Sequence, residues 1–155
     1  GSMCWKKKEN KRSDIKKIYK TTDGMLTNRP DIDKPRRVAA IEQRKDDGAL
    51  AVVKIRSKKG KGGKSYIKEV VLKPENHISL TEESIVEKRV YIGVKIETEE
   101  GTTFKPIFDR ELEDTGDRLT NGEYRKVKRG VAGETKQHRK TYKSKMKRWR
   151  KHFKK

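Results

Sequence analysis

The sequence has few of the residues that build large apolar cores and covalent cross-links. Of its 155 residues only 30% are hydrophobic and 6% are aromatic, and a single one is cysteine. One cysteine excludes an internal disulfide and a zinc site made of several thiolates, and it fits a reducing, cytoplasmic location. No run approaches the roughly eighteen apolar residues that a membrane span needs, so we expect a protein without one.

Charge, in contrast, is abundant and unevenly distributed. Charged residues make up 43% of the chain, and the net charge is +20. Residues 1–29 carry nine Lys/Arg against three Asp/Glu, residues 30–124 carry nineteen of each, and residues 125–155 carry fifteen against one. This division predicts a charge-balanced domain between a basic N-terminal arm and a basic C-terminal tail. Blocks of like charge stay solvated unless a polyanion neutralises them, which favours nucleic acid as the partner.

The central segment has the pattern of short strands separated by turns. Apolar runs occupy residues 38–41, 50–55, 66–72 and 90–96, and turn residues such as Asp46-Asp47-Gly48 lie between them. Short strands at roughly ten-residue spacing are typical of small barrels and sandwiches. We therefore predict a mainly β fold, an SH3-like small barrel.

Helical patterns are expected outside these strands. Residues 6–20 fit either a short basic helix or a frayed, solvated arm, and residues 81–84 fit a single helical turn. Around residues 105–114 apolar side chains follow an i, i+3, i+4, i+8 spacing, which predicts a short peripheral helix beginning near Pro106. Asn121-Gly122 is typical of a tight turn.

The basic tail predicts a helix with one aromatic stripe. Tyr142, Met146, Trp149 and Phe153 recur at helical spacing among many cations. Lys and Arg neutralise phosphates, and aromatic rings stack on exposed bases. Alternatively, the stripe docks the helix on the domain and the charges face water, or the helix lies on an anionic membrane surface. The candidate nucleic-acid contacts in the tail are Arg139, Lys140, Tyr142, Lys143, Lys147, Arg148, Trp149 and Arg150.

A second basic segment is the glycine-lysine loop at residues 58–64. A Walker A motif needs glycine where this chain has Lys58, so a phosphate-binding loop of that type is disfavoured. The loop either follows a phosphate backbone, through Lys58, Lys59, Lys61 and Lys64, or is a plain solvent-exposed loop. His77 is interpreted as a structural histidine, and the sequence supports neither a metal site nor a cofactor.

Three segments in order carry a resemblance to a known family. They are KPRRVAAI at residues 34–41, VVKIRSK at residues 52–58 and LTEESIV at residues 80–86. Over residues 34–97 the chain resembles the MazF/PemK family of toxin endoribonucleases. The resemblance implies that Arg36 is the catalytic arginine and Ser57 the hydroxyl residue of the second turn. RNA cleavage of this kind needs a base for the 2′-hydroxyl, a cation for the phosphorane and an acid for the leaving oxygen.

Three functional hypotheses remain open from the sequence. The protein is a metal-independent endoribonuclease that cleaves single-stranded RNA, or a non-catalytic nucleic-acid-binding accessory protein of a mobile element or ribonucleoprotein. In the third hypothesis the basic tail binds an acidic protein such as an antitoxin. RNA is favoured over DNA, and a homodimer stays open.

Overall fold

The computed structural model describes residues 13–22, 25–26, 35–58 and 69–151. The strands in these residues are β1 (Lys17–Lys20), β2 (Arg37–Gln43), β3 (Leu50–Ser57), β4 (Val70–Leu72), β5 (Ser84–Tyr91), β6 (Val94–Thr98), β7 (Gly101–Lys105) and β8 (Glu113–Arg118). The helices are two short 3₁₀ turns, η1 (Pro74–Asn76) and η2 (Asp109–Glu111), followed by α2 (Asn121–Ala132) and α3 (Lys136–Lys151).

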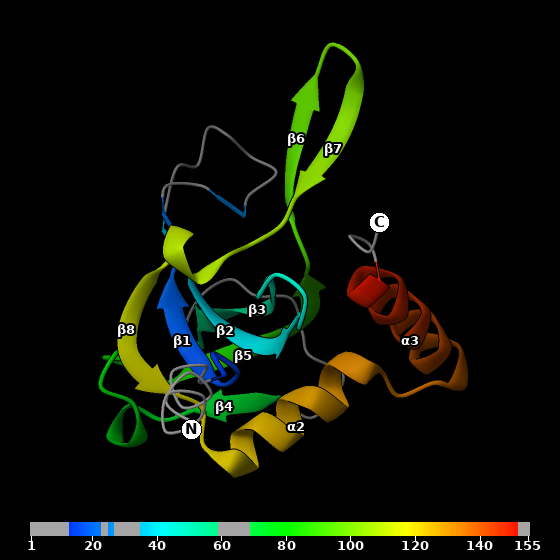
Figure 1. The fold of residues 1–155 in the computed structure, drawn as a ribbon. Coiled ribbons are helices and arrows are strands. Elements are labelled where there is room, and N and C mark those ends of the chain that lie inside the picture. Colours follow the sequence, from blue (N-terminus) through cyan, green and yellow to red (C-terminus); the bar gives the residue numbers. More distant parts are fainter. Residues whose placement is uncertain (1–12, 23–24, 27–34, 59–68, 152–155) are drawn as a thin grey trace, which may run out of the picture.

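Six of the strands form one curled antiparallel sheet in the order β4-β5-β3-β2-β1-β8 (Figure 1). The register shifts between Ala40 and Glu42, between Val53 and Ile55, and between Ile18 and Tyr19. Bulges of this kind bend a strand and increase its twist, so the sheet closes into a half-barrel. The prediction of a small, mainly β, barrel-like domain with helices beside it is confirmed.

The central strands β2 and β3 are buried on both faces. Because side chains alternate along a strand, Ala39 and Ile41 enter the core under the helices, whereas Val38 and Ala40 enter a second cluster on the opposite face. This explains why residues 38–41 form a continuous apolar run. The strands predicted at residues 38–41 and 50–55 are confirmed.

At the N-terminus, residues 17–20 form neither the predicted helix nor the predicted solvated arm. They form β1, which pairs with both β2 and β8, and Ile18 and Tyr19 are buried in opposite clusters. Two adjacent apolar residues point to opposite faces of a strand, so they suit a strand that is covered on both faces. In a helix they would not form a continuous apolar stripe. Residues 13–16 form no helix and lead into β1 through a turn, and residues 6–12 of the predicted helix lie outside the described residues.

The peripheral helix predicted at residues 105–114 is wrong. Ile107 instead makes an isolated bridge with Leu50, and β8 begins after the single turn of η2. The spacing looked helical because Ile107 and Leu112 pack into the second core cluster, although extended backbone carries them there.

Residues 81–96 also differ from their prediction. Ser84 belongs to β5 and not to a helical turn, and the strand predicted at residues 90–96 is divided at Gly93 between β5 and β6. The β6–β7 hairpin projects from the body (Figure 1). A Cβ at Gly93 would lie 3.0 Å from the Lys105 carbonyl oxygen, so this close approach requires glycine at the base of the hairpin.

The tail forms two helices that turn at Gly133. The tight turn predicted at Asn121-Gly122 is the first turn of α2, where Thr120 and Glu123 form a reciprocal capping box. Gly133 ends α2 with φ +97, a backbone conformation that favours glycine. The predicted basic helix is confirmed as α3, with Tyr142, Met146 and Trp149 of the predicted stripe on its inner side, and it lies near the base of the hairpin (Figure 1). Phe153, the fourth residue of that stripe, lies outside the described residues.

Replacing Trp149 tests whether α3 is part of the fold. Its side chain is 4% exposed in the main core, so we expect Trp149→Ala to lower the free energy of unfolding by about 3–5 kcal/mol. Urea unfolding followed by circular dichroism measures this change. Lys147→Ala, two residues away and exposed, is the control and should stay within about 0.5 kcal/mol of the wild type. A loss below 1 kcal/mol for Trp149→Ala, roughly the average point mutation, would contradict a docked α3.

Candidate nucleic-acid interface

The sequence of α3 separates its apolar side from its cations. The helix has nine Lys/Arg and no Asp/Glu, and Met146 and Trp149 are its buried residues. Both belong to the main core cluster, and Tyr142 packs against that cluster while partly buried. Burying this stripe leaves most of the cations on the outward side of the helix. The docking alternative for the aromatic stripe is therefore the arrangement that the structure shows.

A carboxylate on β2 joins the sheet to both helices. The Arg150 Nη2 atom lies 2.6 and 2.8 Å from the two Glu42 carboxylate oxygens, and Lys128 Nζ of α2 lies 3.3 Å from Oε2. The Tyr142 hydroxyl also donates to Glu42 at 3.5 Å. Burial, and then the Glu42 charge, raise the pKa of Tyr142 to about 12. Two cations and a phenol thus converge on a carboxylate whose side chain is only 14% exposed.

A second contact fixes the C-terminal part of α3. The buried Arg44 donates from Nη1 to the Trp149 carbonyl oxygen at 2.9 Å, and its guanidinium lies 5.3 Å from the centre of the Trp149 ring. Asp47 holds the other side of this guanidinium at 2.7 Å. The carbonyl oxygens of a last helical turn lack partners within the helix, so Arg44 satisfies one of them.

The predicted contact residues of the tail divide into two groups. Within the described chain, Lys140, Lys143, Lys147 and Arg148 are exposed and make no hydrogen bond or ion pair. Arg139 is exposed and donates to the Glu134 carbonyl oxygen at 2.7 Å. These five residues face solvent and are open to a ligand.

The other three predicted residues serve the fold in this structure. Trp149 is buried, which corrects its interpretation as an exposed base-stacking ring, since an indole packed in the core has no accessible face. Tyr142 is half-buried with its hydroxyl toward Glu42, and Arg150 is paired with the same carboxylate. A helix with one apolar stripe buries that stripe whenever a core is available.

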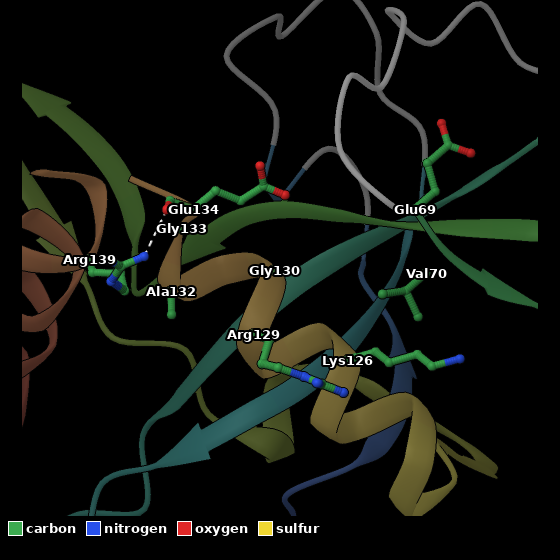
Figure 2. A pocket seen from close by; sticks show the side chains of 9 residues that line it. All are labelled: Glu69, Val70, Lys126, Arg129, Gly130, Ala132, Gly133, Glu134 and Arg139. Carbon is green, nitrogen blue, oxygen red and sulfur yellow. Dashed lines mark hydrogen bonds between the residues drawn. The ribbon is translucent and has the colours of Figure 1, made fainter. Parts of the chain in front are cut away.

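A pocket opens between the start of β4, the C-terminal half of α2 and the first turn of α3 (Figure 2). Lys126 and Arg129 of α2 and Arg139 of α3 line it, together with Glu69 and Glu134. Figure 2 shows the hydrogen bond from Arg139 to Glu134, which bridges the junction between the two helices. The pocket extends the cationic surface of α3 onto α2.

The structure brings Arg36 and Ser57 to the same end of the sheet. Arg37 pairs with Ile55, so Arg36 directly precedes β2 where Ser57 ends the neighbouring β3. Thr21 holds the backbone of Arg36 on both sides: its amide donates to the Arg36 carbonyl oxygen at 2.7 Å, and its hydroxyl accepts from the Arg36 amide at 2.8 Å. The side chain of Arg36 is exposed.

A carboxylate lies on the Ser57 side, directly before β5. The Lys58 amide donates to the Glu83 carbonyl oxygen at 3.0 Å, and Lys58 Nζ lies 3.3 Å from Glu83 Oε1. Lys58 is therefore an exposed residue in an ion pair. The other predicted loop contacts, Lys59, Lys61 and Lys64, lie outside the described residues. A cation, a hydroxyl and a carboxylate are thus carried by neighbouring strand ends.

A buried histidine cluster is the main polar feature that the sequence did not reveal. His77 Nδ1 lies 3.0 Å from Asp117 of β8, and Nε2 lies 2.9 Å from Glu123 of α2. Burial alone would lower the pKa of His77, but the hydrogen bonds to Glu123 and Asp117 raise it overall. Ser79 adds two hydrogen bonds to Asp117. The cluster ties β8 to α2 through the capping residue Glu123, in agreement with a structural histidine.

Comparisons with known proteins add no assignment: no protein-family model matches the chain, and no curated protein matches it. Over the described residues, no helix has the length and apolar character needed to cross a bilayer. The same part of the chain holds no group of three or more His, Cys, Asp or Glu side chains arranged to bind a metal ion.

The histidine cluster makes stability depend on pH. Because the folded pKa of His77 is raised above 6.5, its contribution is complete below that value and is lost as the pH rises through the raised pKa. We expect His77→Gln to lower the free energy of unfolding more at pH 5.5 than at pH 8.5. Urea unfolding of both proteins at the two pH values measures the difference. An equal effect at both would mean that His77 is not charged in the folded state.

Proposed function

We propose that this protein binds single-stranded RNA through the outward face of α3. The observation that carries the proposal is the docking of a helix with nine cations and no acid by its apolar stripe, which leaves Lys140, Lys143, Lys147 and Arg148 exposed and without ion pairs among the described residues. A solvated row of this kind repels itself unless a polyanion neutralises it. Phosphates supply that charge, and their condensed counterions are released on binding.

Lys126 and Arg129 continue this surface at one end of α3. They line the pocket of Figure 2 with Arg139, and both are exposed. An α-helix rises about 1.5 Å per residue, so α3 alone presents its cations over roughly 24 Å. That length suits several consecutive phosphates better than a single small anion. The resemblance of residues 34–97 to a ribonuclease family favours RNA among the polyanions.

Removing three cations tests this surface. We expect Lys140→Ala/Lys143→Ala/Lys147→Ala to weaken binding of a fluorescein-labelled single-stranded RNA at least about tenfold at 50 mM salt. The slope of log affinity against log salt should fall by about 2, since each lost single-strand phosphate contact contributes about 0.7. Fluorescence anisotropy between 50 and 200 mM salt measures both quantities.

The matched control removes the same charge elsewhere. Lys45→Ala/Lys73→Ala/Arg118→Ala takes away three exposed cations from outside α2 and α3 and should leave the salt slope close to that of the wild type. Equal losses in the two triple variants would show that net charge, and not α3, determines binding. No binding of RNA by the wild type at 50 mM salt would remove the proposal. Equal affinity for matched single-stranded DNA would widen it to both nucleic acids.

A second candidate function is metal-independent cleavage of the bound RNA. The register of β2 and β3 favours it, because Arg36 and Ser57 lie on neighbouring strands at one end. In such a reaction the ribose 2′-oxygen gives its proton to a base and attacks the adjacent phosphorus. The 5′-oxygen leaves and takes a proton from water, which yields a cyclic 2′,3′-phosphate and a 5′-hydroxyl. Arg36 stabilises the charged phosphorane, and Ser57 holds a phosphate oxygen. Glu83 is the neighbouring carboxylate able to accept the 2′-hydroxyl proton.

Cleavage in EDTA tests this candidate. We expect the wild type to cut a mixed single-stranded RNA, and Arg36→Ala to be slower by about 10²–10³-fold, the usual cost of one donor to a developing oxyanion. Gel electrophoresis with end-group analysis follows the reaction, and Arg118→Ala is the control for loss of an exposed arginine. Intact RNA with the wild type, or equal cutting by Arg36→Ala, would leave the protein as a binding module.

A further inference from the structure

A second cleft lies at the other end of α3, where the helix faces the base of the β6–β7 hairpin. Side chains of both elements line the cleft, which has a volume of about 630 Å³. This lies within the range of about 300–1,000 Å³ that small-molecule sites occupy. Its walls combine apolar and cationic side chains, among them Ile92, Phe104, Pro106, Lys145, Arg148 and Trp149.

Phe104 is an exposed aromatic side chain of this cleft. It lies on β7, its side chain is 65% exposed, and the hairpin that carries it is solvent-exposed along nearly its whole length. Exposing a hydrophobic ring to water on a projecting hairpin does not stabilise the fold. A two-stranded hairpin is itself only marginally stable. Gly93 nevertheless fixes the hairpin base, since a Cβ there would lie 3.3 Å from the Phe104 Cβ. The ring is therefore presented at a defined place beside α3.

The wall formed by α3 carries cationic side chains next to Trp149. The Trp149 indole Nε1 is buried without a hydrogen-bond partner in the described structure. Arg148 is exposed and, over the same residues, unpaired. Lys145 donates to the Val90 carbonyl oxygen at 2.9 Å and adds positive charge.

We infer that this cleft accepts one unpaired nucleotide of the RNA bound along α3, with its base stacked on Phe104 and its phosphate on Arg148. The inference rests on the proposed function. Aromatic platforms joined to cationic grooves are the usual means of binding single strands, because every base has a π-face. The hairpin tip carries Glu97, Glu99 and Glu100, so a polyanion is favoured only at the hairpin base, next to α3.

This occupant fits the cleft better than an apolar helix of a partner protein. A helix-binding groove needs apolar anchors over several turns. Here the exposed apolar surface is concentrated at Phe104, and Lys145 and Arg148 of α3 line the same cleft. One ring with adjacent cations matches one base with its phosphate. A duplex, whose bases are stacked inside, cannot use the ring.

The test compares single-stranded RNA with a duplex of the same length. We expect Phe104→Ala to weaken single-strand binding about tenfold, the order of one lost base–aromatic stack, and to leave duplex binding and the salt slope unchanged. Phe104→Trp should retain single-strand affinity. Ile78→Ala, which removes an 83% exposed hydrophobic side chain away from the cleft, is the control. Wild-type affinity in Phe104→Ala, or equal losses for both ligands, would overturn the inference.

Tryptophan emission gives a second readout. The chain has two tryptophans, so Trp5→Phe leaves Trp149 as the sole reporter at the cleft. Single-stranded RNA should change its emission, and Phe104→Ala should reduce that change at saturating RNA. Unchanged emission at saturation would contradict occupancy of the cleft. If only the triple lysine variant loses affinity, the inference fails while α3 remains the binding surface; if the wild type binds no RNA, the proposed function fails as well.

Discussion

The neutralisation of tail cations by Glu42 is the interaction on which the arrangement of this protein depends. The tail after residue 124 holds fifteen Lys/Arg and one Asp/Glu and forms most of α2 and all of α3, so the two helices repel each other unless acidic groups are brought between them. Glu42 provides that charge from β2 and contacts Lys128 of α2 and Arg150 of α3 together. Replacing a carboxylate that two cations share leaves both unpaired in a partly buried place, which costs more than loss of a surface ion pair.

Glu42 acts together with the apolar stripe, since neither is sufficient alone. Met146 and Trp149 supply burial, and Arg44 caps the Trp149 carbonyl oxygen, whereas Glu42 determines which cations of α3 face inward. The remaining cations of α3 therefore face the solvent. The same contacts that stabilise the fold thus produce the surface that we propose for RNA, and they remove Trp149 and Arg150 from that surface.

The sequence predicted those elements whose pattern is local and strong. The apolar runs of β2 and β3 and the stripe of α3 are visible in single windows of sequence. The sequence TNGE at residues 120–123 also contained a capping box, which the Asn-Gly pair obscured. In contrast, β8 has the sequence EDTGDR, with no large apolar residue; its extended form depends on pairing with β1 and on the Thr115 hydroxyl, which donates to the Ile18 carbonyl oxygen at 2.6 Å. A strand that depends on such long-range contacts has no hydrophobic periodicity in its own sequence.

The candidate sites, too, could be predicted only where their residues lie in a local sequence pattern. A resemblance points to Arg36 and Ser57, and strand register places their backbones at the same end of β2 and β3. The residues that bind His77 are 40 and 46 positions away in the sequence, so no local sequence motif predicts the cluster. The cleft at Phe104 depends on a hairpin of which the sequence predicts only the first part of β6, as the end of the strand at residues 90–96; β7 contains one apolar residue and has no strand pattern of its own.

One strand, β2, connects the two proposed sites, with Arg36 before its first residue and Glu42 near its last. Six residues of strand span about 20 Å, so the arginine and the docked helix stand at opposite ends of a rigid spacer. A rigid spacer imposes a minimum length on any strand that touches both ends. Oligonucleotides shorter than this distance can occupy one end only. Longer ones that bind α3 present a nucleotide at a fixed distance along the strand to Arg36.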